Sequence, residues 1–153
     1  MRHRRIAIGG AALGAAVLWL GAAPAPGPGA ERAPAFVAVD VFVAVGANTL
    51  AAWQLEVVAP GARLVGVEGS DPGAFAEAPR YDPAALRQDR VILAALAAGD
   101  ALPTGRVRVA RLHFERDDAA PAPPPALLGL VAADRNGLHI LARAELAPVE
   151  KRK

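Results

Sequence analysis

Apolar residues recur at every second position over much of the chain, which is the pattern of β-strands. In residues 36–45 valines occupy one face, and in residues 50–58 the apolar Trp53 alternates with the polar Gln54 and Glu56. We therefore predict two strands, the second with one solvated face. Trp53 is predicted to lie in the core, with its indole N–H hydrogen-bonded to one partner.

Four further stretches continue the pattern. Residues 63–68 form a short run, and residues 106–115 alternate with a change of phase at Val109-Ala110, where a β-bulge would keep both halves facing the core. Near the C-terminus, residues 127–133 and 138–146 flank an Asn-Gly pair, which is the strongest local signal of a β-hairpin.

One segment is compatible with two structures. Asp82-Pro83 has the residues of a helix N-cap and first turn, so that residues 84–98 could form a helix. The β-branched-rich run Val91-Ile92-Leu93 instead favours one helical turn near residues 82–88, followed by a strand. We favour the turn and strand.

Short strands at spacings of about ten residues, with turn residues between them, predict an all-β fold made of a single antiparallel β-sandwich. We place this domain at residues 35–148 and a basic tail at 149–153.

The N-terminus has the composition of a targeting segment. Arginines in the first five residues precede 18 apolar or glycine residues at 6–23, which predicts an apolar targeting helix within residues 1–25. This segment is either a signal peptide or an uncleaved membrane anchor, because its length also suffices to cross a bilayer. Residues 26–34 are a Pro/Gly/Ala linker. We expect an extracytoplasmic protein whose only membrane contact, if any, is through residues 6–23.

The net charge of +2 arises in this N-terminal segment. Without its three arginines, the chain carries 14 basic residues against 15 acidic ones, so the sequence lacks the basic surface that nucleic-acid binding requires. Cysteine is absent, which excludes thiol chemistry.

Candidate chemistry is sparse. Glu68, Asp71, Glu77 and Asp82 fall on one stretch and offer oxygen ligands for calcium, although their spacing matches no calcium loop and solvated loop carboxylates are the favoured interpretation. Ser70, the only serine, lacks the sequence pattern of a nucleophile elbow. We therefore expect no catalytic residues, no enzyme activity and no resident cofactor, with calcium as the one open possibility.

The order of these elements resembles the cohesin-like branch of β-sandwich domains, a jelly-roll type shared with cellulose-binding modules of exported bacterial proteins. The resemblance spans about residues 37–146 and is one of strand order and turns. The residues that carry it are Val39-Asp40-Val41-Phe42-Val43, Ala51-Ala52-Trp53-Gln54-Leu55-Glu56, Val65-Gly66-Val67-Glu68-Gly69, Tyr81-Asp82-Pro83-Ala84-Ala85-Leu86, Val91-Ile92-Leu93-Ala94-Ala95 and Leu102-Pro103-Thr104-Gly105-Arg106.

The resemblance implies a binding module, since cohesins hold dockerin modules through one flat sheet face and related modules hold polysaccharides through exposed aromatic residues. We expect another exported protein as the partner, with a polysaccharide as the alternative and a small hydrolase as a more remote one. The polar positions of the predicted strands supply the candidate ligand or partner face, namely Gln54, Glu56, Arg106, Arg108, Arg111 and His113.

Overall fold

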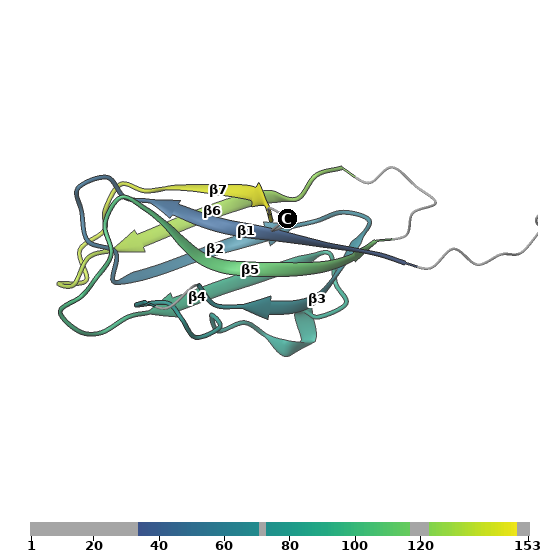
Figure 1. Cartoon of the computed structure of the whole chain (residues 1–153), viewed down its shortest axis with the longest axis horizontal. Helices are drawn as coiled ribbons and strands as arrows, with labels where there is room; N and C mark the ends of the chain where they lie inside the picture. The colour runs from purple at the N-terminus through teal and green to yellow at the C-terminus, as the bar shows by residue number, and fades with distance from the viewer. Residues whose placement is uncertain (1–33, 71–72, 117–122, 150–153) are drawn as a thin grey trace, which may run out of the picture. The chain divides into compact units, whose positions relative to one another are not determined.

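The computed structural model describes residues 34–70, 73–116 and 123–149, which contain seven strands and one 3-10 turn (Figure 1). All of them belong to one compact unit, Arg32–Lys153. In chain order the elements are β1 Ala35–Ala44, β2 Ala52–Val58, β3 Ala62–Glu68, η1 Pro83–Ala85, β4 Arg90–Leu96, β5 Arg106–Arg116, β6 Ala126–Ala133 and β7 Arg143–Pro148.

The strands form two antiparallel sheets. One has the order β3-β5-β1-β7 and the other the order β4-β2-β6. Inward-facing aliphatic residues of both sheets make one core, in which Val41, Leu55, Leu93 and Leu112 are at most 1% exposed. The prediction of an all-β, antiparallel two-sheet domain is therefore confirmed.

The predicted β-bulge in β5 is present. Val41 of β1 is opposite Ala110, but the next residue, Phe42, is opposite Arg108, so Val109 is the extra residue of β5. Val109 and Ala110 are adjacent in sequence and both completely buried. The bulge thus turns two consecutive apolar side chains toward the core, where strict alternation would have exposed one of them.

The segment with two possible structures forms a turn followed by a strand, as we favoured. The Asp82 side chain accepts a hydrogen bond from the Ala84 backbone N–H at 2.9 Å, and the 3-10 turn ends after Ala85. Leu86 is already extended, with φ −61° and ψ 135°, and Arg87 then adopts a φ of 73°, a left-handed conformation that precedes the entry of the chain into β4.

The Asn-Gly turn forms, but the prediction of a hairpin strand over residues 138–146 is wrong. The Asp134 carboxylate accepts hydrogen bonds from two backbone N–H groups of the turn, and pairing then stops after a single bridge between Ala133 and His139. β6 pairs with β2, whereas β7 begins only at Arg143 and pairs with β1 in the other sheet. The chain therefore crosses from one sheet to the other after the turn, and residues 138–142 form this connection.

None of the helices within the described residues is long and apolar enough to span a membrane. The predicted targeting segment and linker, residues 1–25 and 26–34, lie outside the described residues except for Pro34.

Candidate functional site

The six candidate face residues lie on two different sheets. Gln54 and Glu56 point outward from β2, in the three-stranded sheet. The other four lie on β5, in the four-stranded sheet, and alternate there with buried residues; they are Arg106, Arg108, Arg111 and His113. Because the outer faces of the two layers point in opposite directions, the structure brings four of these residues together and separates them from the other two.

The outer face of the three-stranded sheet is largely aliphatic. Its exposed large hydrophobic side chains are Ile92 (50% exposed) and Leu96 (78%) on β4, with Leu128 (51%) and Val131 (43%) on β6. We call this surface the aliphatic face and define it by these four residues. None of these four residues belongs to the predicted candidate face.

The register of the strands places polar residues in the middle of the aliphatic face. Glu56 is opposite Ile92 on one side and Leu128 on the other, so the three side chains form a row across the sheet. In the next row Gln54 lies between Ala94 and Val131. Arg90 makes an ion pair with Glu56 at 2.6 Å. The face is therefore a mixed surface, with aliphatic side chains flanking a narrow polar centre.

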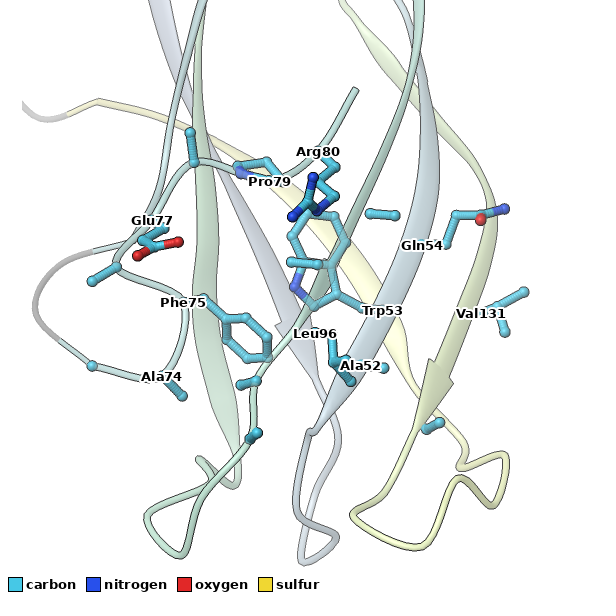
Figure 2. A pocket seen from close by; sticks show the side chains of 18 residues that line it. Ala52, Trp53, Gln54, Ala74, Phe75, Glu77, Pro79, Arg80, Leu96 and Val131 are labelled. Carbon is cyan, nitrogen blue, oxygen red and sulfur yellow. The ribbon is translucent and has the colours of Figure 1, made fainter. Parts of the chain in front are cut away.

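A hollow of about 790 Å³ adjoins the aliphatic face and is lined by residues 73–80 and by parts of β4, β2 and β6 (Figure 2). Its lining is mainly alanine and larger apolar residues, and includes Leu96 and Val131 of the aliphatic face. Two backbone hydrogen bonds between Arg80 and Ala94, of 2.8 and 3.0 Å, hold residues 73–80 against the edge of β4. The volume lies within the range of roughly 300–1,000 Å³ that is typical of ligand sites.

Trp53 forms part of the wall of this hollow and is buried, as predicted, with 2% of its surface exposed. Phe75, carried by the loop, packs edge to face against it with the ring centroids 6.3 Å apart. The predicted partner of the indole N–H is not found, because Nε1 is buried without a hydrogen-bond partner among the described residues. Its surroundings explain this, since the neighbouring side chains of the hollow are mostly alanine and Phe75.

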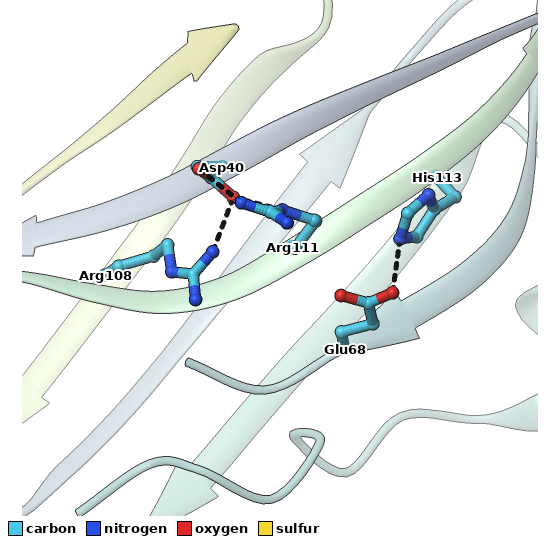
Figure 3. Close-up of polar contacts among 5 residues, drawn as sticks. All are labelled: Asp40, Glu68, Arg108, Arg111 and His113. Atoms are coloured by element: carbon cyan, nitrogen blue, oxygen red, sulfur yellow. Dashed lines mark hydrogen bonds and ion pairs between the residues drawn. The ribbon is translucent and has the colours of Figure 1, made fainter. Parts of the chain in front are cut away.

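The outer face of the four-stranded sheet, which we call the charged face, carries several ion pairs (Figure 3). Asp40 of β1 is opposite Arg111 of β5 and accepts two hydrogen bonds from its guanidinium, at 2.7 and 3.1 Å. Arg108 donates a third to Asp40 at 3.3 Å. Nearby, His113 Nε2 lies 2.9 Å from a Glu68 carboxylate oxygen.

The same pairing continues along the charged face. Arg63 forms an ion pair with Glu115, and Arg106 forms one with Glu145 at 3.0 Å. The guanidinium of Arg106 also stacks on the Phe42 ring, 3.5 Å from its centre. The three arginines predicted as a candidate face are thus paired with two carboxylates of the chain itself, Asp40 and Glu145. Such pairing partly neutralises the charged face and weakens its attraction for an anion.

The ion pairs shift the pKa of Asp40. Burial by itself raises the pKa of this carboxyl group, but the hydrogen bonds and positive charges of Arg111 and then Arg108 outweigh burial and hold the pKa below its ordinary value of 3.8. A lowered pKa in the folded state means that ionised Asp40 stabilises the fold above pH 3.8. This contribution is lost as the pH falls from about 3.8 through the lower folded-state pKa.

We predict that Asp40→Asn lowers the free energy of unfolding at pH 7 by about 1–2 kcal/mol, because it weakens charge-assisted hydrogen bonds to two arginines. Urea unfolding of both proteins at a series of pH values measures the difference. The difference should be constant above pH 5 and shrink as the pH falls below about 3.8, where Asp40 becomes protonated first in the unfolded chain and then, at its lower pKa, in the folded protein. A difference that stays the same down to pH 2 would show that the ionised carboxylate contributes nothing.

The residues considered for calcium binding are not gathered at one site within the described residues. Asp71 lies outside them, Glu68 is paired with His113, and Asp82 caps the 3-10 turn. No group of three or more His, Asp or Glu side chains in the described residues is close enough together to hold a metal ion. The Ser70 backbone N–H donates to Phe75 O at 2.7 Å, so this residue helps to close the loop that carries Phe75.

Comparisons with protein-family models, with curated proteins and with solved structures gave no match to this chain. Any functional conclusion therefore depends on the geometry and chemistry of the described residues.

Proposed function

We propose that this chain is an exported, non-catalytic module, similar to cohesins, that binds another exported protein through the aliphatic face. The observation that carries the proposal is the exposure of Ile92, Leu96, Leu128 and Val131 on the outer face of one sheet, around the polar Gln54 and Glu56. Several large apolar side chains exposed near one another, with polar groups among them, are typical of protein–protein contact sites.

The two faces of the domain differ in a way that supports this assignment. On the charged face the carboxylates of the chain already pair with its arginines. On the aliphatic face the exposed methyl groups remain in water and gain free energy when a partner covers them. Glu56 and Gln54 in its middle provide the hydrogen-bonding groups that fix the orientation of a partner.

Aromatic residues favour a protein over a polysaccharide as the partner. Stacking on sugar rings requires exposed aromatic side chains arranged in a plane. Trp53, Phe75 and Phe114 are at most 3% exposed, and Phe42 lies under Arg106. Phe36 is the one aromatic residue among the large exposed hydrophobic residues of the described ranges, and a single ring does not make a platform.

Export is the part of the proposal that depends on residues 1–25. We predict that the chain, produced with its own N-terminus, is recovered outside the cytoplasm. Intact mass spectrometry of the recovered protein then separates a signal peptide, for which residues 1–25 are lost, from an anchor, for which they are kept. Recovery of the protein in the cytoplasm alone would contradict export.

Binding is tested with the exported form, tagged at its C-terminus and incubated with the exported proteins of the source organism or with insoluble cellulose and chitin. We expect capture of a specific protein, and Leu96→Asp should weaken its binding about tenfold or more, because a carboxylate must be desolvated in the contact. Phe36→Asp, which changes a similarly exposed residue on the other sheet, is the matched control and should alter binding less than about twofold.

Two results would overturn the proposal. Retention on cellulose or chitin without a protein partner would assign the domain to polysaccharide binding. If Leu96→Asp and Phe36→Asp weakened binding of the captured protein equally, the contact would not be specific to the aliphatic face.

A further inference from the structure

The hollow beside the aliphatic face contains a charged group that the domain itself does not neutralise. Arg80 is the only basic residue among those that line the hollow, and it is exposed. Within the described residues its guanidinium has no carboxylate within ion-pair distance. Arg63, Arg106, Arg108 and Arg111 of the charged face, and Arg90 of β4, are in contrast paired with carboxylates.

The backbone determines where the Arg80 side chain emerges. Arg80 is directly opposite Ala94 in an antiparallel bridge, and residues directly opposite each other project from the same face of a sheet. Ala94 lies in the same row as Gln54 and Val131, on the outer face. Arg80 therefore lies at the edge of the aliphatic face, and Figure 2 shows it above Trp53, with Gln54 and Val131 to the right.

The other acidic and polar groups of the hollow do not substitute for a missing partner. Glu77 lies on the loop, away from the sheet in Figure 2, and forms no ion pair with Arg80. The strands contribute mainly apolar residues to the lining of the hollow, among them Ala52, Ala94, Leu96 and Ala133. A guanidinium at the edge of a mainly apolar lining fits a ligand that combines aliphatic groups with a carboxylate.

We propose that the partner bound by the aliphatic face presents a segment with an acidic residue, whose side-chain carboxylate pairs with Arg80 while a neighbouring aliphatic side chain enters the hollow. This inference rests on the proposed function and adds the chemistry of the partner. Arg80 acts as the specificity-determining contact, because a partner without the carboxylate would cover the guanidinium and leave it unpaired.

The test uses the exported form, immobilised by its C-terminal tag, as the target for a random linear twelve-residue peptide library displayed on phage. The peptides are fused at their C-termini, so that only side-chain carboxylates are available. We expect the enriched peptides to combine Asp or Glu with aliphatic residues. The enriched peptides are then synthesised with amidated C-termini, and their affinities are measured for four variants of the domain.

Arg80→Glu should lower the affinity for these peptides about tenfold or more. Arg80→Lys should lower the affinity less, because lysine keeps the positive charge and loses only the planar guanidinium that can donate two parallel hydrogen bonds to a carboxylate. Arg143→Glu, at an exposed position on β7 in the other sheet, makes the same change of charge and should leave affinity within about twofold. Matching thermal melts of the variants establish that each is folded. Leu96→Asp reports separately on the aliphatic face.

The outcomes distinguish the two proposals. Enriched peptides without acidic residues, or peptides whose affinity survives Arg80→Glu but falls with Leu96→Asp, would overturn the role of Arg80 and leave the docking face standing. Peptides unaffected by either variant would place binding elsewhere and contradict both proposals. Failure to enrich any peptide would also contradict the inference about Arg80.

Discussion

Replacing Trp53 with alanine is expected to lower the free energy of unfolding by about 3–5 kcal/mol, the largest effect of any single substitution considered for this chain. Trp53 is 2% exposed, lies between the two sheets and packs against Phe75, so its removal leaves a cavity that neighbouring alanines cannot fill. Loss of the contact also frees the loop that carries Phe75. Chemical denaturation of the two proteins, followed by far-UV circular dichroism, measures the difference.

Trp53→Phe is the matched variant. Because Nε1 makes no hydrogen bond within the described residues, phenylalanine loses packing volume but no hydrogen bond, and it should cost less than half as much as alanine. If the two variants were equally destabilised, the N–H group would have to contribute an interaction absent from this structure. If Trp53→Ala had the same midpoint denaturant concentration as the wild type, the assignment of Trp53 to the core would be wrong.

Gly69→Ala is expected to destabilise the domain by about 3 kcal/mol, at the upper end of the effect of overpacking. A Cβ atom at position 69 would lie far inside van der Waals contact with the carbonyl oxygens of Ala76 and Glu77, and only 2.6 Å from the Ala76 carbonyl carbon. These are backbone atoms, so relief requires the whole loop to move. The loop carries Phe75, and its displacement would expose that ring and open the core beside Trp53.

Gly66→Ala provides the control for this substitution. The nearest atom to a Cβ at position 66 is Cδ2 of His113, at 3.5 Å, which is an ordinary van der Waals contact. We expect a change of less than about 1 kcal/mol, because the glycine is on a strand and alanine fits there. Thermal melts of both variants compare them directly. Equal melting temperatures for Gly69→Ala and Gly66→Ala would show that the loop is not held closely against Gly69.

Much of the sheet structure was predictable because period-two alternation is a local property of the sequence. The valines of β1 and the change of phase at Val109-Ala110 identified a strand and its bulge, since a core accepts only apolar side chains. The same rule could not indicate which sheet a strand joins. The Asn-Gly turn therefore suggested a hairpin between β6 and β7, although β7 pairs with β1 across the domain.

The candidate site was less predictable, and strand topology explains why. Alternation correctly marked Gln54 and Arg111 as solvated, but only the arrangement of the strands shows that they lie on opposite outer faces. Ile92 belongs to the run Val91-Ile92-Leu93, which is apolar on both sides, so periodicity could not identify the exposed residue. Arg80 became a candidate only through its bridge to Ala94, which no local pattern predicts.

The position of the contact on the domain is tested most directly by nuclear magnetic resonance. The exported form, labelled with ¹⁵N, is titrated with the captured protein, and changes in backbone amide shifts are mapped onto the two sheets. We predict that the changes concentrate in β4, in β2 around Gln54 and Glu56, and in β6 between Leu128 and Val131. Changes that instead concentrate around Asp40, Arg108 and Arg111 on the charged face would contradict docking through the aliphatic face.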